Sequence, residues 1–344
     1  MNRTSIARLA SRSLLASLVL LPAICAAQPT PPIPEQRPLQ PDIREVAASA
    51  PINIPSPTLG GIQFWTDQRV QGGWRIQRNS VTTHCRILDS RNVRHGWGTY
   101  EQCEAILLRE QAAGKVRPPS AHVVLLIHGL MGSRPLLEPL QKYLQKQGMD
   151  AMCVSYASTR HTIDDHAEAL AQVIDRLGPG IKRIDFVGHS MGNIVVRRYL
   201  AMLPPNSPKL RRLGAMVMLA PPNQGAEIAS RIKRSAMFQI IAGDSGQQLA
   251  DFNNLEGKLA IPSCPFGIVA GGGSGRNPLV EGDDDLLVSV EETKLAGAAD
   301  FIVVDAMHRS LPKQPEVLEI THRFLTRGYF RSEQERMRLP EARR

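Results

Sequence analysis

The sequence predicts an α/β protein: a doubly wound, mostly parallel sheet with an N-terminal antiparallel hairpin and a small cap or lid insertion. The first observation is a series of continuous apolar runs, which indicate strands buried on both faces of a parallel sheet. The second is that helical patterns separate these runs. The third is composition, since 344 residues that are 42% hydrophobic and 21% charged can bury a complete core.

Residues 1–27 have the pattern of a secretory signal peptide. Arginines at positions 3, 8 and 12 precede a short apolar stretch, and small residues precede a cleavage position before Gln28. The stretch is too short for a transmembrane span, so we expect export to the periplasm or beyond, with cleavage. Acylation of Cys25 to give a lipoprotein is the alternative. Ile24 and Pro22 weaken it, because small residues and leucine are usual there.

The segments that flank the folded domain have biased compositions. Residues 28–58 contain nine prolines, which predicts an extended, exposed linker. The domain is then expected at 59–328, followed by a basic tail at 329–344. Six of the nine net positive charges lie in the first twelve residues and in the segment from Arg327 onward. A nucleic-acid role needs a clustered basic surface and is therefore not expected.

Four cysteines remain after the signal peptide. In an oxidising compartment nearby thiols tend to pair, and Cys85 and Cys103 close a short loop, so we expect a disulfide between them. Two buried, unpaired thiols are the alternative. The pairing of Cys153 and Cys264 stays open, because they lie in separate apolar runs. No Cys/His spacing is typical of zinc, and neither a metal nor a cofactor is predicted.

Each expected element has its own local signal. Residues 74–79 and 84–89 predict the hairpin, and a helix is expected from about 100 to 111. Thr162 is the expected N-cap of a helix whose apolar residues follow at spacings of three and four. The buried strands are expected at 123–127, 151–155, 184–187, 213–219, 266–270 and 301–304.

The strongest chemical signal is Gly188-His189-Ser190-Met191-Gly192, which directly follows an expected strand and directly precedes an expected helix. A nucleophilic serine on a strained strand-to-helix turn needs this layout, because flanking glycines remove side chains that would collide across the turn. The helix also points its positive N-terminus at the serine. Ser190 is therefore the candidate nucleophile.

From about Val123 to Leu325 the sequence resembles the α/β-hydrolase superfamily, and more narrowly its bacterial lipase and esterase branches. His128-Gly129-Leu130 is similar to the oxyanion loop of such lipases. The resemblance implies that two backbone N–H groups, those of Leu130 and Met191, hold the oxyanion. Because the backbone donates, the side chains at these two positions matter less.

A serine nucleophile needs a base, and the base needs a carboxylate that fixes its tautomer. His308 follows the last expected strand, where the resemblance places the base. Lipase-like chains carry Asp-Gly-x-Val-x-Val before it, and aligning the final Val-x-Val selects Asp285 as the acid, with Asp284 as the alternative. Leu286 then stands where the family usually has glycine. The two upstream aspartates, Asp283 and Asp284, are expected to be solvated.

The other histidines are given structural interpretations. We expect His128 and His189, which belong to the two motifs, to bond to backbone groups and to transfer no proton. His161, His166 and His322 are expected on helix surfaces.

Residues 225–261 lie where such folds insert cap helices. Their apolar side chains could line an acyl pocket, form a small lid, or belong to the ordinary core. These are Ile228, Ile232, Met237, Phe238, Ile240 and Ile241.

Taken with the resemblance, these residues predict an exported serine hydrolase that cleaves carboxylic esters, which could include lipid esters, through an acyl-enzyme. The expected partners are a small-molecule or lipid ester and, at the periphery, a membrane surface. Acyl transfer on the same triad is one alternative. A non-catalytic binding protein on a hydrolase fold is another, and it would predict a missing triad member. The sequence does not predict the oligomeric state.

Overall fold

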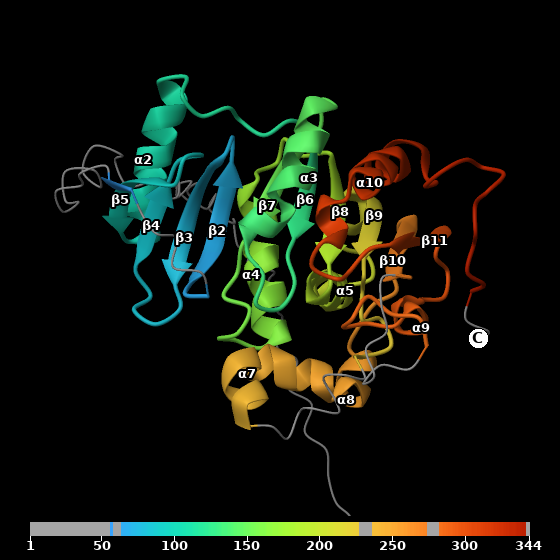
Figure 1. Ribbon diagram of the computed structural model, residues 1–344. Helices are drawn as coiled ribbons and strands as arrows, with labels where there is room; N and C mark the ends of the chain where they lie inside the picture. The colour runs from blue at the N-terminus through green and yellow to red at the C-terminus, as the bar shows by residue number, and fades with distance from the viewer. Residues whose placement is uncertain (1–55, 58–62, 227–235, 274–281, 342–344) are drawn as a thin grey trace, which may run out of the picture. The chain divides into compact units, whose positions relative to one another are not determined.

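The computed structural model describes residues 56–57, 63–226, 236–273 and 282–341. The predicted signal peptide, Cys25 and most of the predicted linker lie outside these residues. Within them, a five-stranded antiparallel sheet precedes a six-stranded parallel sheet (Figure 1). None of the described helices is long and apolar enough to cross a membrane.

The parallel sheet confirms the predicted fold class. Its strand order is β11-β10-β9-β8-β6-β7, and every neighbouring pair is parallel. Each of the six predicted runs coincides with one of its strands, although the run 151–155 extends one residue beyond its strand. A strand covered on both faces needs apolar side chains on both. The strands are β6 (His122–Ile127), β7 (Asp150–Val154), β8 (Arg183–His189), β9 (Leu213–Leu219), β10 (Phe266–Gly272) and β11 (Asp300–Asp305).

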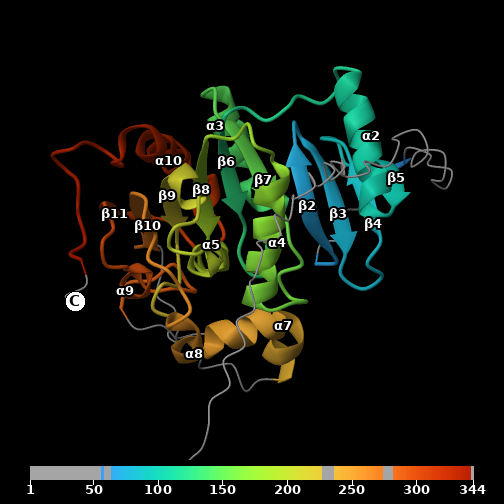
Figure 2. The ribbon, with the colours of Figure 1, turned by 180° about the vertical axis from the view of Figure 1, so that it is seen from behind.

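Helices cover both faces of this sheet (Figure 1 and Figure 2). On β6, Val124 belongs to a buried cluster with Leu137 of α3, whereas Leu125 belongs to a cluster with Ile163 of α4. The helices are α3 (Arg134–Lys146) and α10 (Pro315–Arg327) on one face, and α4 (Ile163–Arg176) and α5 (Met191–Met202) on the other. The predicted N-cap is confirmed, since Thr162 accepts a hydrogen bond from the N–H of Asp165 in a capping box.

Shorter helices complete the described chain. Two of them, α7 and α8, lie in the predicted cap insertion, although the side chains proposed there for an acyl pocket lie outside the described part. The helices are α7 (Ala236–Ala250), α8 (Phe252–Glu256), α9 (Val290–Thr293) and the 3-10 turns Leu210–Arg212 and Leu311–Lys313.

The predicted hairpin is confirmed as β3 and β4, but it is the centre of a larger sheet with the order β1-β5-β4-β3-β2. The predicted linker is also too long, because Ser56 pairs with Arg94 of β5. Helix α2 (Tyr100–Ala112) lies where a helix was predicted and begins with a capping box at Thr99. The strands are β1 (Ser56–Pro57), β2 (Trp65–Gln71), β3 (Trp74–Asn79), β4 (Cys85–Leu88) and β5 (Val93–Gly98).

The predicted disulfide is not formed in this structure. Cys85 and Cys103 are both free and buried, and they pack in one apolar cluster between the antiparallel sheet and α2. A short loop brings two thiols near each other but does not orient them for a bond. Burial raises the pKa of the Cys103 thiol to about 12, so it packs as a small neutral side chain. Cys153 and Cys264 are free and belong to separate clusters.

The predicted boundary at residue 328 does not end the packed domain. Gly328, with φ of +80°, ends α10, and Phe330 then packs on Phe324 and is only 1% exposed. The buried Asp300 carboxylate accepts hydrogen bonds from the N–H groups of Phe301, Phe330 and Met337 at 2.7–2.9 Å. The arginines of this segment suggested a solvated tail, but its backbone is tied to β11.

We expect Asp300→Ala to lower the free energy of unfolding by about 3 kcal/mol, because the buried N–H groups of Phe301 and Phe330 and the part-buried N–H of Met337 lose a charged acceptor. The change is measured from the midpoint of urea unfolding, provided that the dependence of the unfolding free energy on urea concentration is the same in both proteins. The control is Glu319→Ala, which removes an exposed carboxylate paired with Arg323 and should cost less than about 1 kcal/mol. Equal effects of the two changes would contradict the role assigned to Asp300.

Candidate active site

Ser190 lies alone between the end of β8 and the start of α5, as the sequence motif predicts. Its backbone has φ of +53° and ψ of −129°, a conformation that non-glycine residues rarely adopt. The Ser190 N–H donates to the Leu219 carbonyl (2.9 Å), which helps hold the turn. A Cβ at Gly192 would lie 2.3 Å from the Ile127 carbonyl oxygen, so this position has no room for a side chain. The turn therefore needs the small residue that the motif supplies.

The loop after β6 lies against this serine. Register pairs Ile127 with Gly188, so the loops that follow β6 and β8 leave the sheet side by side. A Cβ at Gly129 would lie 2.7 Å from the Ser190 Cβ, which shows how close the loop comes. Within the described chain, neither the Leu130 N–H nor the Met191 N–H donates to another residue. Both are free to bind an oxyanion.

Asp285 and His308 are in direct contact although they are 23 positions apart in the sequence. His308 Nδ1 and Asp285 Oδ2 are 2.7 Å apart, and the His308 N–H donates to the Asp285 carbonyl (2.9 Å). The Asp285 side chain is 0% exposed, and its other oxygen accepts from the N–H groups of Leu287 and Val288. The carboxylate is thus held rigidly, and it can fix the imidazole tautomer with the proton on Nδ1.

The other two aspartates have different environments. Asp283 is exposed, as predicted, and accepts from the Gly273 N–H (2.7 Å). Asp284 is 0% exposed, so the prediction that it is solvated is wrong. Its carboxylate folds back on its own turn and accepts from the Leu286 N–H (2.6 Å). Leu286 has φ of +81°, which explains why lipase-like chains favour glycine at this place.

His189 connects the serine turn to the base. Its Nε2 lies 2.9 Å from the His308 carbonyl oxygen, to which it donates, and the two rings are 4.8 Å apart. Ser190 directly follows His189, so this hydrogen bond holds the backbone of His308 next to the Ser190 turn. The Ser190 hydroxyl has no hydrogen bond to another residue of the described chain. Catalytic hydrogen bonds of this kind often tighten only when substrate binds.

Besides His308, three histidines are buried near this site: His128, His166 and His189. His128 and His189 bond to backbone groups, as predicted. His166, predicted on a helix surface, is only 2% exposed and lies 3.0 Å from Ser245 Oγ, so that prediction is wrong. Its position three residues after Ile163 on α4 could have revealed the buried face. His161 and His322 are half-buried.

Burial lowers the pKa of these three rings, to about 4 for His128, to about 3 for His166 and well below the ordinary value for His189. In the unfolded chain they titrate near 6.5. Their contribution to stability is therefore complete above pH 6.5 and is lost as the pH falls toward the folded pKa values.

We expect the free energy of unfolding to fall by about 4 kcal/mol per pH unit between pH 6 and pH 4.5, about 1.4 for each buried ring. Urea unfolding across this range measures the slope. The variant His166→Gln should reduce the slope by about a third. A free energy that stays constant from pH 6.5 to pH 5 would contradict the neutral state of these rings.

Comparison with known proteins agrees with this geometry. Residues 118–250 match the family described as "Putative serine esterase (DUF676)". This segment carries the candidate oxyanion loop and Ser190. Over this segment the chain is similar to that family, in agreement with the resemblance to α/β-hydrolases drawn from the sequence.

Solved structures are more distant. Phospholipase PlaB from Legionella pneumophila is 21% identical, with a TM-score of 0.42 over 50% of this chain and 45% of that chain. This chain therefore spans less than half of PlaB. The lipase BlEst2 from Bacillus licheniformis in its propeptide form is 17% identical, with a TM-score of 0.48 over 66% and 54%. The metagenomic carboxyl esterase MGS0156 is 17% identical, with a TM-score of 0.44 over 60% and 76%. No curated protein matches the chain.

Proposed function

We propose that this protein is an exported serine hydrolase that cleaves carboxylic esters through Ser190, His308 and Asp285. The observation that carries the proposal is the 2.7 Å contact between the buried Asp285 carboxylate and His308 Nδ1, beside the strained serine turn. Such a pair has the arrangement that activates a neighbouring hydroxyl. The pattern of residues 1–27 supports export.

In the proposed reaction, His308 Nε2 takes the Ser190 proton as the serine oxygen attacks the ester carbonyl. The N–H groups of Leu130 and Met191 bind the oxyanion of the tetrahedral intermediate. The imidazolium then protonates the leaving alcohol, and an acyl group remains on Ser190. Water, deprotonated by His308, attacks this acyl-enzyme, and the acid and free serine are released.

Apolar side chains next to the three loops support an ester with an apolar acyl part. Met131, Leu287 and Met307 are each within two residues of Leu130, Asp285 or His308, and they are 39–51% exposed. Scattered apolar side chains are ordinary on a surface, but here they flank one site. A fatty acyl chain, or the surface of a lipid aggregate, could contact them.

A series of p-nitrophenyl esters of increasing chain length, offered to the mature protein, tests the function. We expect hydrolysis of at least one member, with Ser190→Ala as the blank. Adding excess alcohol separates acyl transfer, in which a new ester forms, from hydrolysis, in which only the acid forms. A protein that hydrolyses no ester and leaves Ser190 unlabelled by a fluorophosphonate would contradict the proposal.

A further inference from the structure

We propose that Gln63, which lies between β1 and β2 of the antiparallel sheet, is a positioning residue for the oxyanion loop. The inference rests on the proposed function, since it assigns Gln63 the task of holding the Leu130 N–H in place. Gln63 lies outside the segment that matches the serine esterase family.

Both polar atoms of the Gln63 side-chain amide form hydrogen bonds. Its Nε2 donates to the Gly132 carbonyl in the oxyanion loop (3.0 Å). Its Oε1 accepts from Ser158 Oγ (2.9 Å) and from the N–H and hydroxyl of Thr159 (3.2 Å each). One side chain therefore ties the loop after β6 to the loop after β7.

Ser158 adds a second tie to the same loop. Its hydroxyl donates to Gln63 and accepts from the Met131 N–H (3.0 Å). The Ser158 side chain is fully buried, so these bonds form away from water, where losing either one would be costly. Leu130 is thus followed by two residues, Met131 and Gly132, whose backbone groups are fixed by this pair of side chains.

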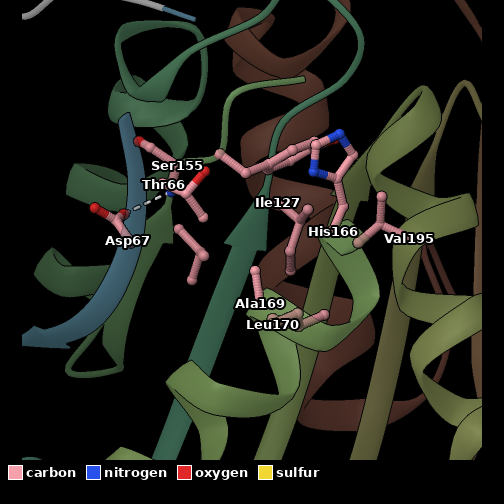
Figure 3. Close-up of a pocket in the computed structure, with 10 residues that line it drawn as sticks. Thr66, Asp67, Ile127, Ser155, His166, Ala169, Leu170 and Val195 are labelled. Atoms are coloured by element: carbon pink, nitrogen blue, oxygen red, sulfur yellow. Dashed lines mark hydrogen bonds between the residues drawn. The ribbon is translucent and has the colours of Figure 1, made fainter. Parts of the chain in front are cut away.

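Strand β2 places Gln63 beside the loop by running along residues 155–159. The Asp67 N–H donates to the Ser155 carbonyl (2.8 Å), and the Ser155 N–H donates to Asp67 Oδ2 (2.6 Å). Further along, the Ala157 N–H donates to Thr66 Oγ1 (3.2 Å). Figure 3 shows Thr66, Asp67 and Ser155 together at this junction, with Ile127 of β6 beside them. Gln63 continues the same series of contacts.

The geometry points to an effect on the transition state and not on substrate binding. An oxyanion donor acts only when it is aimed at the charge that develops during reaction, so a small displacement of the loop weakens it. The ester in its ground state has no such charge. Loss of the Gln63 contacts should therefore lower kcat and leave KM nearly unchanged.

The first test is Gln63→Met, a change of similar size that can neither donate strongly nor accept strongly. We expect kcat to fall by ten- to a hundredfold, with KM altered less than about threefold, on the scale of losing part of one oxyanion donor. The control is Gln71→Met in β2, because Gln71 Nε2 donates to Gln111 on α2 and not to the loop. We expect the control to keep kcat within about twofold.

Binding of an alkyl boronic acid separates positioning from a general loss of structure. Its tetrahedral adduct on the serine places a negative oxygen where the oxyanion forms, so its inhibition constant should rise by about the same factor as kcat falls. Gln63→Glu is the second variant, since a carboxylate still accepts from Ser158 but cannot donate to Gly132. It should be impaired in the same two measurements, even if Gln63→Met does not fold.

Amide hydrogen exchange provides a readout that does not need activity. We expect exchange across residues 128–133 to accelerate in the Gln63 variants and not in Gln71→Met. Variants of Gln63 with unchanged kcat and unchanged exchange would overturn the inference while leaving the proposed function intact. An unreactive wild-type protein would instead contradict the proposed function, and the exchange experiment would still decide whether Gln63 holds the loop.

Discussion

We expect Ser190→Ala to give a folded protein whose esterase kcat is lower by about five orders of magnitude. Removing the nucleophile leaves only the oxyanion donors and substrate binding, which give a small residual acceleration. The Ser190 N–H and carbonyl keep their backbone partners in the variant, so the turn has no reason to unfold. The measurements are initial rates on a reactive ester and the thermal unfolding midpoint.

A matched control and a labelling experiment make this result specific. Ser207→Ala removes a serine from the loop after α5, far along the chain from the motif, and should keep activity within about twofold. A fluorophosphonate should label the wild-type protein at Ser190, and mass spectrometry identifies the site. Labelling at another serine, with Ser190→Ala still active, would remove Ser190 from the mechanism.

The second large effect is expected for Asp285→Asn, with a fall in kcat of about four orders of magnitude and little change in KM. An asparagine oxygen can still accept from Leu287 and Val288. If its amide then faces His308, Nδ1 must accept a hydrogen bond, and the proton moves to Nε2. In that tautomer the ring cannot remove a proton from Ser190. The full pH profile of kcat measures the loss.

The two neighbouring aspartates are the controls for this prediction. Asp283→Asn changes an exposed carboxylate and should lower kcat by less than about tenfold. Asp284→Asn should also keep kcat within about tenfold. Because Asp284 is buried and accepts from Leu286, however, it should lower the free energy of unfolding by about 1 kcal/mol. If Asp284→Asn were nearly inactive and Asp285→Asn remained active, the catalytic acid would be Asp284 and not Asp285.

The parallel sheet could be predicted because its signal is local. A strand such as Leu213–Leu219 is buried on both faces, so its own sequence shows what surrounds it. The choice of Asp285 and His308 likewise depends on short motifs, namely the Val-x-Val pattern and the position after the last strand. The structure brings these two side chains into contact. The Ser190 turn needed only a strand, two glycines and a helix.

Contacts between distant segments could not be predicted in this way. Strand β2 is not predicted because its buried residues include Asp67 and Gln68, whose polar side chains bond to Ser155 and Arg176, far along the chain. His166 and Asp284 were misplaced for the same reason, since each is covered by residues that the local pattern does not reveal. For Cys85 and Cys103 the sequence shows how many residues separate the thiols along the chain, but not how the two side chains are oriented in the fold.

The run of β2 along residues 155–159 has a consequence for the edge of the parallel sheet. Strand β7 is the edge of the parallel sheet, and all five of its residues are buried. An open, apolar edge strand attracts the edges of other molecules and promotes aggregation. Here the antiparallel sheet lies beside the end of β7 and occupies Ser155. A shortened chain that begins after this sheet would present that edge to solvent, and it should self-associate even if its parallel sheet folds.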